Sequence, residues 1–273
     1  MDILVCFKIV PDLDMLSSSD WVVSSHCEVD TSFAKPMFNL YDEAALELVL
    51  KLRDQAENKI ESLNLTALTI GNSFADRFLK NLYALKYHNA VRVNYEEDIR
   101  FNSPFVAKII SNYIEKEGKI GIVVLGNQSG VGDNGKTPFI LAELLGIPLI
   151  SGVTSITPSE EEGYFTVIST KDDIKIKQVV KAPIILSVGN IQSAYLRVPT
   201  LKDKMAAKKK RIKILDLEHL GIEKEKKEEE NDVTLIDIFY EKKERVCEIV
   251  EGGDAKEKAK ILYEKYLKER LAE

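Results

Sequence analysis

The chain has 273 residues, a hydrophobic fraction of 45% and a formal net charge of -6 at pH 7. This length gives room for one large α/β domain, or for one domain with an extension. The acidic balance argues against a general nucleic-acid binder, because such proteins usually carry a basic face. Three widely spaced cysteines and three scattered histidines show no metal-binding spacing, and the cysteines favour a reducing compartment. No apolar run approaches the roughly 20 residues that span a bilayer. We therefore expect a cytoplasmic protein.

The first half of the chain alternates apolar runs with amphipathic stretches. Residues 3–10 are nearly all apolar and predict a strand that is covered on both faces. Asn39 or Asp42 can cap a helix that begins near residue 40. Further strands are expected at 64–70, 90–93 and 120–125, with helices at 75–86 and 104–116 between them. This alternation predicts a parallel sheet with helices on both faces. Ligands of such sheets bind beyond the carboxyl ends of the strands.

A glycine-rich stretch from Gly126 to Pro138 follows the strand at 120–125. An apolar segment at 139–145 comes next and predicts a helix with Pro138 in its first turn. A strand, a glycine loop and a helix start together present free backbone N–H groups and a positive helix end to an anion. We expect a phosphate-bearing ligand at this loop.

The same stretch contains an alternative motif. Residues from Gly130 to Thr137 satisfy the P-loop pattern of glycine, four residues, glycine, lysine and threonine. The preceding strand ends about four residues too early for a P-loop, however, and Pro138 follows the threonine at once. A nucleotide-hydrolysing P-loop protein is therefore one alternative. A stand-alone nucleotide-binding sensor module of the same sheet type is another.

The second half of the chain has a different pattern. Residues 151–157, 164–169 and 174–180 alternate apolar and polar residues and predict an antiparallel meander, followed by a last core strand at 184–188. Residues 195–204 predict an exposed loop. A highly charged segment at 223–232 predicts a linker or a solvated helix, and residues 255–271 predict a terminal amphipathic helix.

Four segments together resemble the β subunit of electron transfer flavoproteins, including the FixA-like branch. They are the opening strand with Lys8, the box Asn39-Leu-Tyr-Asp-Glu43, the glycine loop with the helix after it, and the segment from Arg197 to Lys210. The resemblance extends from Met1 to about Lys213. It implies an α/β fold, namely a Rossmann-like adenine-nucleotide-binding domain over residues 1–213 with an antiparallel hairpin insertion at about 150–183. Residues 214–273 would form a charged linker and a C-terminal arm that packs on the partner.

The resemblance also implies a role. The β subunit pairs with an α subunit that holds most of the redox FAD, and the heterodimer carries electrons between dehydrogenases and a downstream acceptor. The β subunit usually binds AMP, and in electron-bifurcating members a second FAD places its adenosine phosphate end in the same pocket. The chain would then be an electron carrier subunit and not an enzyme with catalytic residues of its own. Consistently, the sequence shows no nucleophile with a matching base and no metal ligands.

Carried over by position, the resemblance implies a set of cofactor-binding residues in three segments and the glycine loop. They are Cys6, Asn39, Leu40, Tyr41, Asp42, Ile70, Gly126, Asn127, Gln128, Ser129, Gly130, Val131, Gly132, Asp133, Asn134, Gly135, Lys136 and Thr137. Two features depart from the family. Lys136 replaces a usual glutamine and adds positive charge near the phosphate. The loop at 99–104 lacks the turn that bifurcating members carry there, which argues against bifurcation.

Two further assignments concern partners. The segment from Ile191 to Val198 matches the loop through which the family contacts an acyl-CoA dehydrogenase or another flavin dehydrogenase. Arg197 matches an arginine that lies near the flavin ring at the subunit interface, where its charge would stabilise a reduced flavin. An ordinary surface arginine is the alternative for Arg197.

Overall fold

The computed structural model describes residues 1–56, 62–118, 120–132, 135–172, 174–191, 195–223, 235–239 and 247–271. The chain divides into two compact units, Met1–Asp237 and Ile238–Glu273. Within the described part, no helix is long and apolar enough to cross a membrane.

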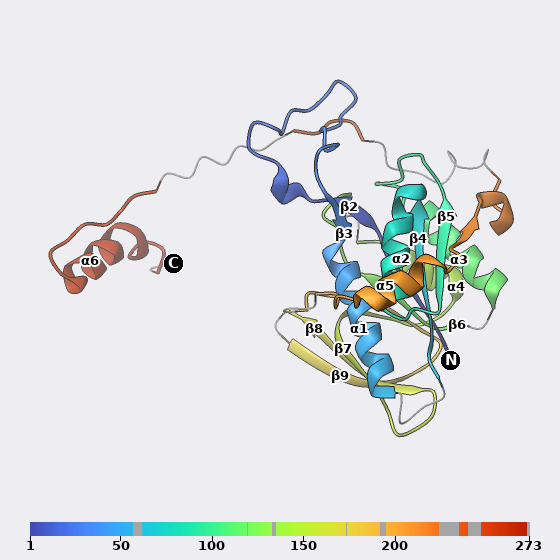
Figure 1. Cartoon of the computed structure of the whole chain (residues 1–273). Coiled ribbons are helices and arrows are strands. Elements are labelled where there is room, and N and C mark those ends of the chain that lie inside the picture. The colour runs from blue at the N-terminus through green and yellow to red at the C-terminus, as the bar shows by residue number, and fades with distance from the viewer. Residues whose placement is uncertain are drawn as a thin grey trace. The chain divides into compact units, whose positions relative to one another are not determined.

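A nine-stranded sheet, counted over the described residues, forms the centre of the first unit (Figure 1). Its strands are β1 (Asp2–Cys6), β4 (Asn64–Gly71), β5 (Asn89–Asn94), β6 (Ile120–Gly126), β7 (Leu149–Pro158), β8 (Tyr164–Lys171), β9 (Ile174–Lys181), β10 (Ile184–Val188) and β11 (Lys213–Leu215). They lie in the order β11-β5-β4-β1-β6-β10-β7-β8-β9. Neighbouring strands from β11 to β7 are parallel, whereas β8 and β9 pair antiparallel.

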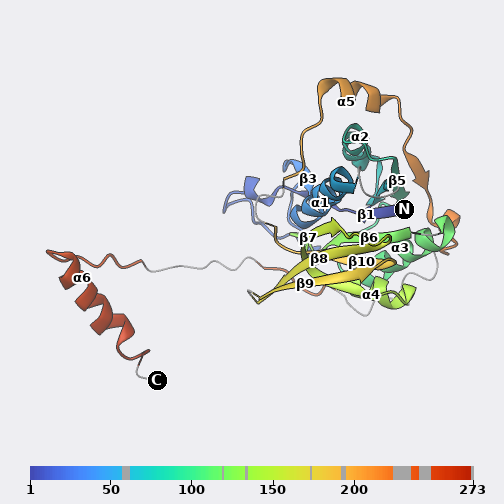
Figure 2. The same ribbon diagram turned by 90° about the horizontal axis from the view of Figure 1, so that it is seen from below.

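Helices cover both faces of the sheet. α1 (Leu40–Ala56) and α2 (Asp76–Ala84) lie on one face, and α3 (Ser103–Glu117) and α4 (Thr137–Leu145) lie on the other (Figure 2). Two apolar cores result, because each helix buries one face against the strands. Leu50 of α1 and Leu79 of α2 belong to the first core, and Phe105 of α3 and Leu141 of α4 belong to the second. This arrangement confirms the predicted α/β, Rossmann-like fold.

The strand order reverses next to β1. The chain first adds β4 and then β5 on one side of β1, and it then crosses to the other side to add β6. Loops that leave neighbouring strands at such a reversal diverge, which opens a crevice beyond the carboxyl ends of the strands. The ends of β1 and β6 therefore define the expected position of a ligand site.

The predicted strand at residues 3–10 is wrong in its second half. β1 ends at Cys6, and the short strand β2 (Ile9–Pro11) pairs antiparallel with β3 (Pro36–Phe38) in a separate sheet. The chain leaves the main sheet at Lys8 because the backbone N–H of Lys8 donates to the Asp42 side chain at 2.8 Å. The apolar pattern alone did not reveal this side-chain acceptor.

The predicted meander and last core strand are both present. β7, β8 and β9 form the meander, and β10 lies between β6 and β7. The meander extends the central sheet, because β7 is parallel to β10 on one side and antiparallel to β8 on the other.

The predicted exposed loop at 195–204 is wrong from residue 201 onward. α5 (Leu201–Lys208) begins there and packs on α2, and the short strand β11 follows it. Thr200 caps α5, since its hydroxyl accepts a hydrogen bond from the backbone N–H of Asp203 at 3.2 Å. Threonine followed by an acidic residue three positions later is a signature of a helix start, and the sequence analysis overlooked it.

Short helical turns complete the first unit at Leu13–Met15, Ser73–Ala75 and Leu217–Leu220. In the second unit, α6 (Ala255–Leu262) continues into a π-helical turn at Tyr263–Leu267, where the terminal helix was predicted. The predicted charged segment at 223–232 lies outside the described residues except for Glu223.

Candidate functional site

A pocket of about 390 Å³ lies at the carboxyl ends of β1, β4 and β6. Most of the predicted cofactor-binding residues line it: Cys6, Asn39, Asp42, Ile70, Gly126, Asn127, Gln128, Ser129, Val131, Gly135, Lys136 and Thr137. Leu40, Tyr41, Gly130 and Gly132 do not line the pocket. Asp133 and Asn134 lie outside the described residues. The fold thus collects segments that are distant in the sequence around one cavity.

One wall of the pocket is apolar. It is formed by Cys6 of β1, Leu68 and Ile70 of β4, and Val106 and Ile110 of α3, which pack together in the second core. Burial raises the pKa of the Cys6 thiol far above its usual value, so this side chain stays neutral and acts as part of the apolar wall. Such a wall suits a flat aromatic ring.

Asp42 joins the ends of two strands to the start of α1. Its carboxylate accepts the backbone N–H of Lys8 and the backbone N–H of Gly126, each at 2.8 Å. Burial raises the pKa of Asp42 to about 6, although these hydrogen bonds and one from Asn39 oppose the increase. The buried carboxylate therefore fixes the geometry of the pocket floor.

Gly126 permits this close approach of α1 to β6. A Cβ atom at this position would overlap the Asp42 side chain and would lie 2.8 Å from Tyr41 Cβ and 2.9 Å from Asp42 N. Contacts this short do not occur for real side chains, so any larger residue would push α1 away from the strand end.

Contacts with three other segments hold the glycine loop in place. The Lys8 ammonium donates to the carbonyl of Val131 at 2.8 Å, and the Asn39 side-chain amide donates to the carbonyl of Gln128 at 2.7 Å. Gly132 has a φ of +82° and packs so closely on Arg100 that a Cβ would lie 2.5 Å from the Arg100 carbonyl oxygen. The loop is therefore preformed by contacts with β1, α1 and the loop before α3.

Several backbone N–H groups of the loop already donate hydrogen bonds within the chain. Gly126 donates to Asp42, Asn127 donates to the Val188 carbonyl at 2.8 Å, and Val131 donates to the Ser129 hydroxyl at 3.3 Å. The best-placed donors are thus at 135–137, where the chain enters α4.

Two features of residues 135–137 suit an anion. Gly135 has a φ of +61° and Lys136 is in the right-handed helical region, a sequence of conformations that turns successive N–H groups toward one point. No side chain caps the start of α4, and the Thr137 hydroxyl lines the same pocket. This end of the pocket therefore suits an anionic group.

The sequence analysis missed several residues that line the pocket. Lys8 was recognised at the end of the first strand but not among the cofactor-binding residues, and Asn72 and Phe74 were not assigned to the pocket. Arg100 and Ser103 were considered only as part of the loop that departs from bifurcating members. Asn72 and Phe74 directly follow β4, so a stricter use of the rule on strand ends would have found them. Arg100 lies between β5 and α3, and Ser103 is the first residue of α3. Both come several residues after the carboxyl end of β5, so the rule on strand ends indicates them less directly.

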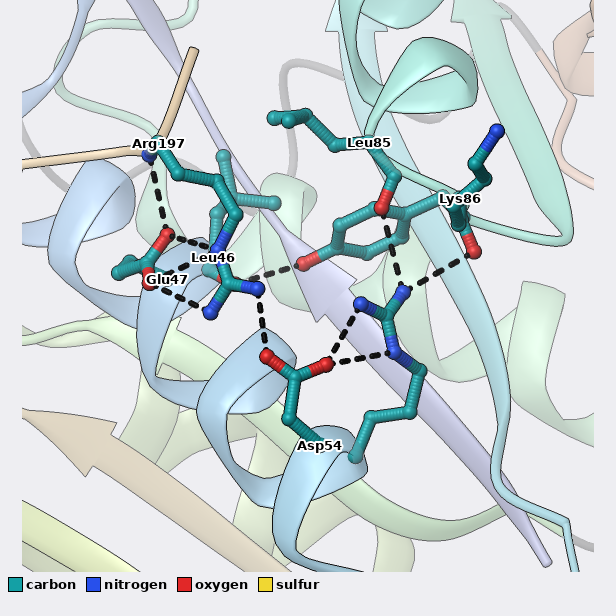
Figure 3. A network of polar contacts seen from close by, with 8 residues as sticks. Leu46, Glu47, Asp54, Leu85, Lys86 and Arg197 are labelled. Atoms are coloured by element: carbon teal, nitrogen blue, oxygen red, sulfur yellow. Dashed lines mark hydrogen bonds and ion pairs between the residues drawn. The ribbon is translucent and has the colours of Figure 1, made fainter. Parts of the chain in front are cut away.

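Arg197 does not line the pocket and instead pairs with α1 (Figure 3). Its guanidinium contacts Glu47 at 2.8 Å and Asp54 at 2.5 Å, two carboxylates that lie two helical turns apart. The hydrogen bonds that Arg197 donates to Glu47 raise the pKa of Arg197 above its usual value. The positive charge of Arg197 is therefore paired with two carboxylates of the same chain. Of the segment from Ile191 to Val198, residues 192–194 lie outside the described residues.

The structure gives limited support to the P-loop alternative. β6 ends at Gly126, and Gly130, the first glycine of the motif, does not line the pocket. A P-loop protein also uses an aspartate near its magnesium ion. The Asp42 carboxylate of this pocket instead accepts hydrogen bonds from two backbone N–H groups. The described residues contain no group of three or more His, Cys, Asp or Glu side chains placed to bind a metal ion.

Comparison with known proteins identifies relatives over most of the chain. The electron transfer flavoprotein domain matches residues 30–220. YgcR of Escherichia coli strain K12, provisionally assigned as an electron transfer flavoprotein subunit, is 28% identical over 99% of both chains. The electron transfer flavoprotein subunit beta of Bacillus subtilis strain 168 is 27% identical over 84% of this chain and 85% of its own.

Proposed function

The chain belongs to the electron transfer flavoprotein family and is of the β-subunit type, and we propose that it pairs with a flavin-carrying α subunit. The heterodimer carries electrons between dehydrogenases and a downstream acceptor. FAD, held mainly by the α subunit, supplies the redox chemistry when it is bound. The chain contributes a rigid nucleotide pocket and docking surfaces, and it acts as an electron carrier subunit. The family match does not favour a P-loop NTPase or a stand-alone sensor.

The pocket holds AMP, or the adenosine phosphate end of a second FAD. The observation that carries this proposal is the pairing of an apolar wall at Cys6 and Ile70 with uncapped N–H donors at 135–137 in one cavity of about 390 Å³. That size falls within the usual range for small-ligand sites. Asp42, Asn39 and Lys8 hold the pocket in shape.

Partner contacts are proposed for three regions. The C-terminal arm within residues 214–273 packs on the α subunit, and its helix exposes Leu262, Tyr263 and Leu267. The segment from Ile191 to Val198 meets a flavin dehydrogenase. Arg197 lies at the flavin interface, where its pairing with Glu47 would reduce the positive field that reaches the flavin. We place the complex in the cytoplasm, which agrees with three unpaired cysteines.

Co-expression with the flavin-carrying partner tests this proposal. The purified complex is denatured, and the released nucleotides are identified by mass and by absorbance. We expect one FAD in the α subunit and an adenosine nucleotide or a second FAD in this chain. The chain expressed alone serves as the control and should contain no redox FAD. Stable behaviour without any flavoprotein partner, or Mg²⁺-dependent ATP hydrolysis that Lys136→Ala abolishes, would overturn the proposal.

A further inference from the structure

Among the described residues of the P-loop-like motif, Lys136 carries a charge that the proposed function does not explain. It occupies the cap position of α4, but its side chain makes no capping hydrogen bond. The side chain is exposed and lines the nucleotide pocket. Among the described residues, no carboxylate or carbonyl partner is found for its ammonium group. The charge is therefore available to a ligand.

The other cations of the pocket lie elsewhere along the glycine loop. The ammonium of Lys8 contacts the Val131 carbonyl, and Arg100 packs beside Gly132 and pairs with Asp98 at 2.7 Å. Asp42 is the only carboxylate among the described lining residues, and its oxygens face backbone N–H groups. Among the described residues, the cations near Val131 are therefore balanced by the carboxylates of Asp42 and Asp98, whereas the positive charge of Lys136 is not.

A single phosphate can use the backbone donors at 135–137, and the exposed ammonium of Lys136 at the same end of the pocket can then pair with a second phosphate. A lysine that follows the last glycine of such a loop reaches the outer phosphates of a nucleotide. We propose that Lys136 makes this pocket selective for an adenosine that carries a diphosphate over one that carries a monophosphate. The diphosphate belongs either to free ADP or to the ADP half of FAD. This inference rests on the proposed function and narrows its ligand.

The test compares AMP and ADP on the complex with the α subunit after bound nucleotide has been removed. Isothermal titration gives both dissociation constants for the wild type, for Lys136→Gln and for Lys51→Gln, an exposed lysine of α1 that does not line the pocket. Hydrogen bonds to charged groups contribute about 1.5–3 kcal/mol, which corresponds to at least about tenfold in affinity. We expect wild-type ADP binding to be at least about tenfold tighter than AMP binding. Lys136→Gln should remove that preference, and Lys51→Gln should keep it.

The outcomes separate the inference from the proposed function. Equal binding of AMP and ADP by the wild type, or equal weakening of both by Lys136→Gln, overturns the inference and leaves the proposed function intact. Binding of neither nucleotide overturns both. The nucleotides released from the untreated complex distinguish the sources by mass and by the amount of flavin per heterodimer, since the α subunit supplies one FAD and a diphosphate in this pocket adds either ADP or a second FAD. Release of AMP beside a single FAD contradicts the inference.

Discussion

The Asp42 carboxylate lies where a side chain of residue 126 would otherwise be. Its Oδ1 accepts the Gly126 backbone N–H at 2.8 Å, and a Cβ on Gly126 would overlap that same oxygen. The helix that begins at Leu40 and the strand that ends at Gly126 thus meet through one hydrogen bond that only glycine allows. Since the glycine loop leaves directly from Gly126, this contact sets where the loop begins.

Gly126→Ala should therefore both destabilise the chain and damage the pocket. The added methyl group would push against Asp42 and Tyr41, and such overpacking costs about 1–3 kcal/mol. We expect a lower midpoint in urea unfolding and weaker retention of nucleotide by the complex, since the start of the loop would shift.

Gly130→Ala is the matched control for that substitution. Gly130 lies in the same loop, but a Cβ there would meet nothing within 4 Å, and its φ is not in the left-handed region. Its stability should remain within about 0.5 kcal/mol of the wild type. If Gly126→Ala behaves like Gly130→Ala, the close contact between α1 and β6 does not exist as described.

Asp42 should also make stability depend on pH with an unusual sign. Burial raises its pKa to about 6 in the folded chain, against about 3.9 in the unfolded chain. Between these values the folded state binds more protons than the unfolded state, so the free energy of unfolding falls as pH rises from about 4 to about 6. The difference of about two pKa units corresponds to about 3 kcal/mol. Urea unfolding of the wild type and Asp42→Asn across this range measures it.

The quantity to follow is the wild-type free energy of unfolding minus that of Asp42→Asn, because the contributions of the titratable groups that both proteins share then cancel. It should decrease with rising pH. Asp98→Asn gives a control of opposite sign, because the hydrogen bonds from Arg100 hold the pKa of Asp98 below its usual value. That second difference should increase as pH rises through the Asp98 titration. A flat or rising curve for Asp42 would contradict its burial as a carboxylic acid.

The alternation of apolar and amphipathic segments was enough to predict the parallel sheet, the helices on both faces and the meander. These features follow from local periodicity, which is set by the side chains within one element. The early end of β1 could not be predicted in this way. It depends on Lys8 meeting Asp42, a residue 34 positions later, and no periodicity records such a contact.

The candidate site likewise combines features that the sequence pattern predicts with features that it does not predict. The glycine loop and the strand ends were found from their pattern, because a turn and a helix start are local. Which N–H groups of the loop remain free was not predictable, since Asn127 donates to Val188 of β10, a strand more than 50 residues away. The approach of Arg100 to Gly132 likewise depends on how α3 crosses the sheet.

Arg197 should stabilise the segment that follows residue 195 by holding it against α1. Its guanidinium and its backbone N–H both contact Glu47, whose side chain is only 6% exposed. Arg197→Ala would leave that carboxylate buried without a charged partner, at a cost of about 1–3 kcal/mol. Thermal or urea unfolding of the isolated chain measures the loss.

A double-mutant cycle distinguishes this pairing from a general effect of the substitution. Adding Glu47→Gln to Arg197→Ala should recover part of the lost stability, because the amide can still accept the Arg197 backbone N–H but carries no charge. Lys213→Ala is the control, since the Lys213–Glu117 pair is about half exposed on both sides and such surface pairs contribute below about 1 kcal/mol. Strictly additive effects of the two α1-facing substitutions would mean that Arg197 and Glu47 do not interact.

The terminal helix should matter for association and not for the stability of the chain alone. Leu262 is 45% exposed and Leu267 is 36% exposed, and no residue of α6 is buried. Leu262→Gln combined with Leu267→Gln preserves helix propensity, so the unfolding midpoint of the isolated chain should not change. Burying a leucine at an interface contributes about 1.5–3 kcal/mol, and the double variant should therefore bind the α subunit at least about tenfold more weakly in a titration. Val22→Gln, at an apolar residue that is 69% exposed in the first unit, should bind like the wild type. Unchanged affinity of the double variant would mean that Leu262 and Leu267 do not contact the α subunit.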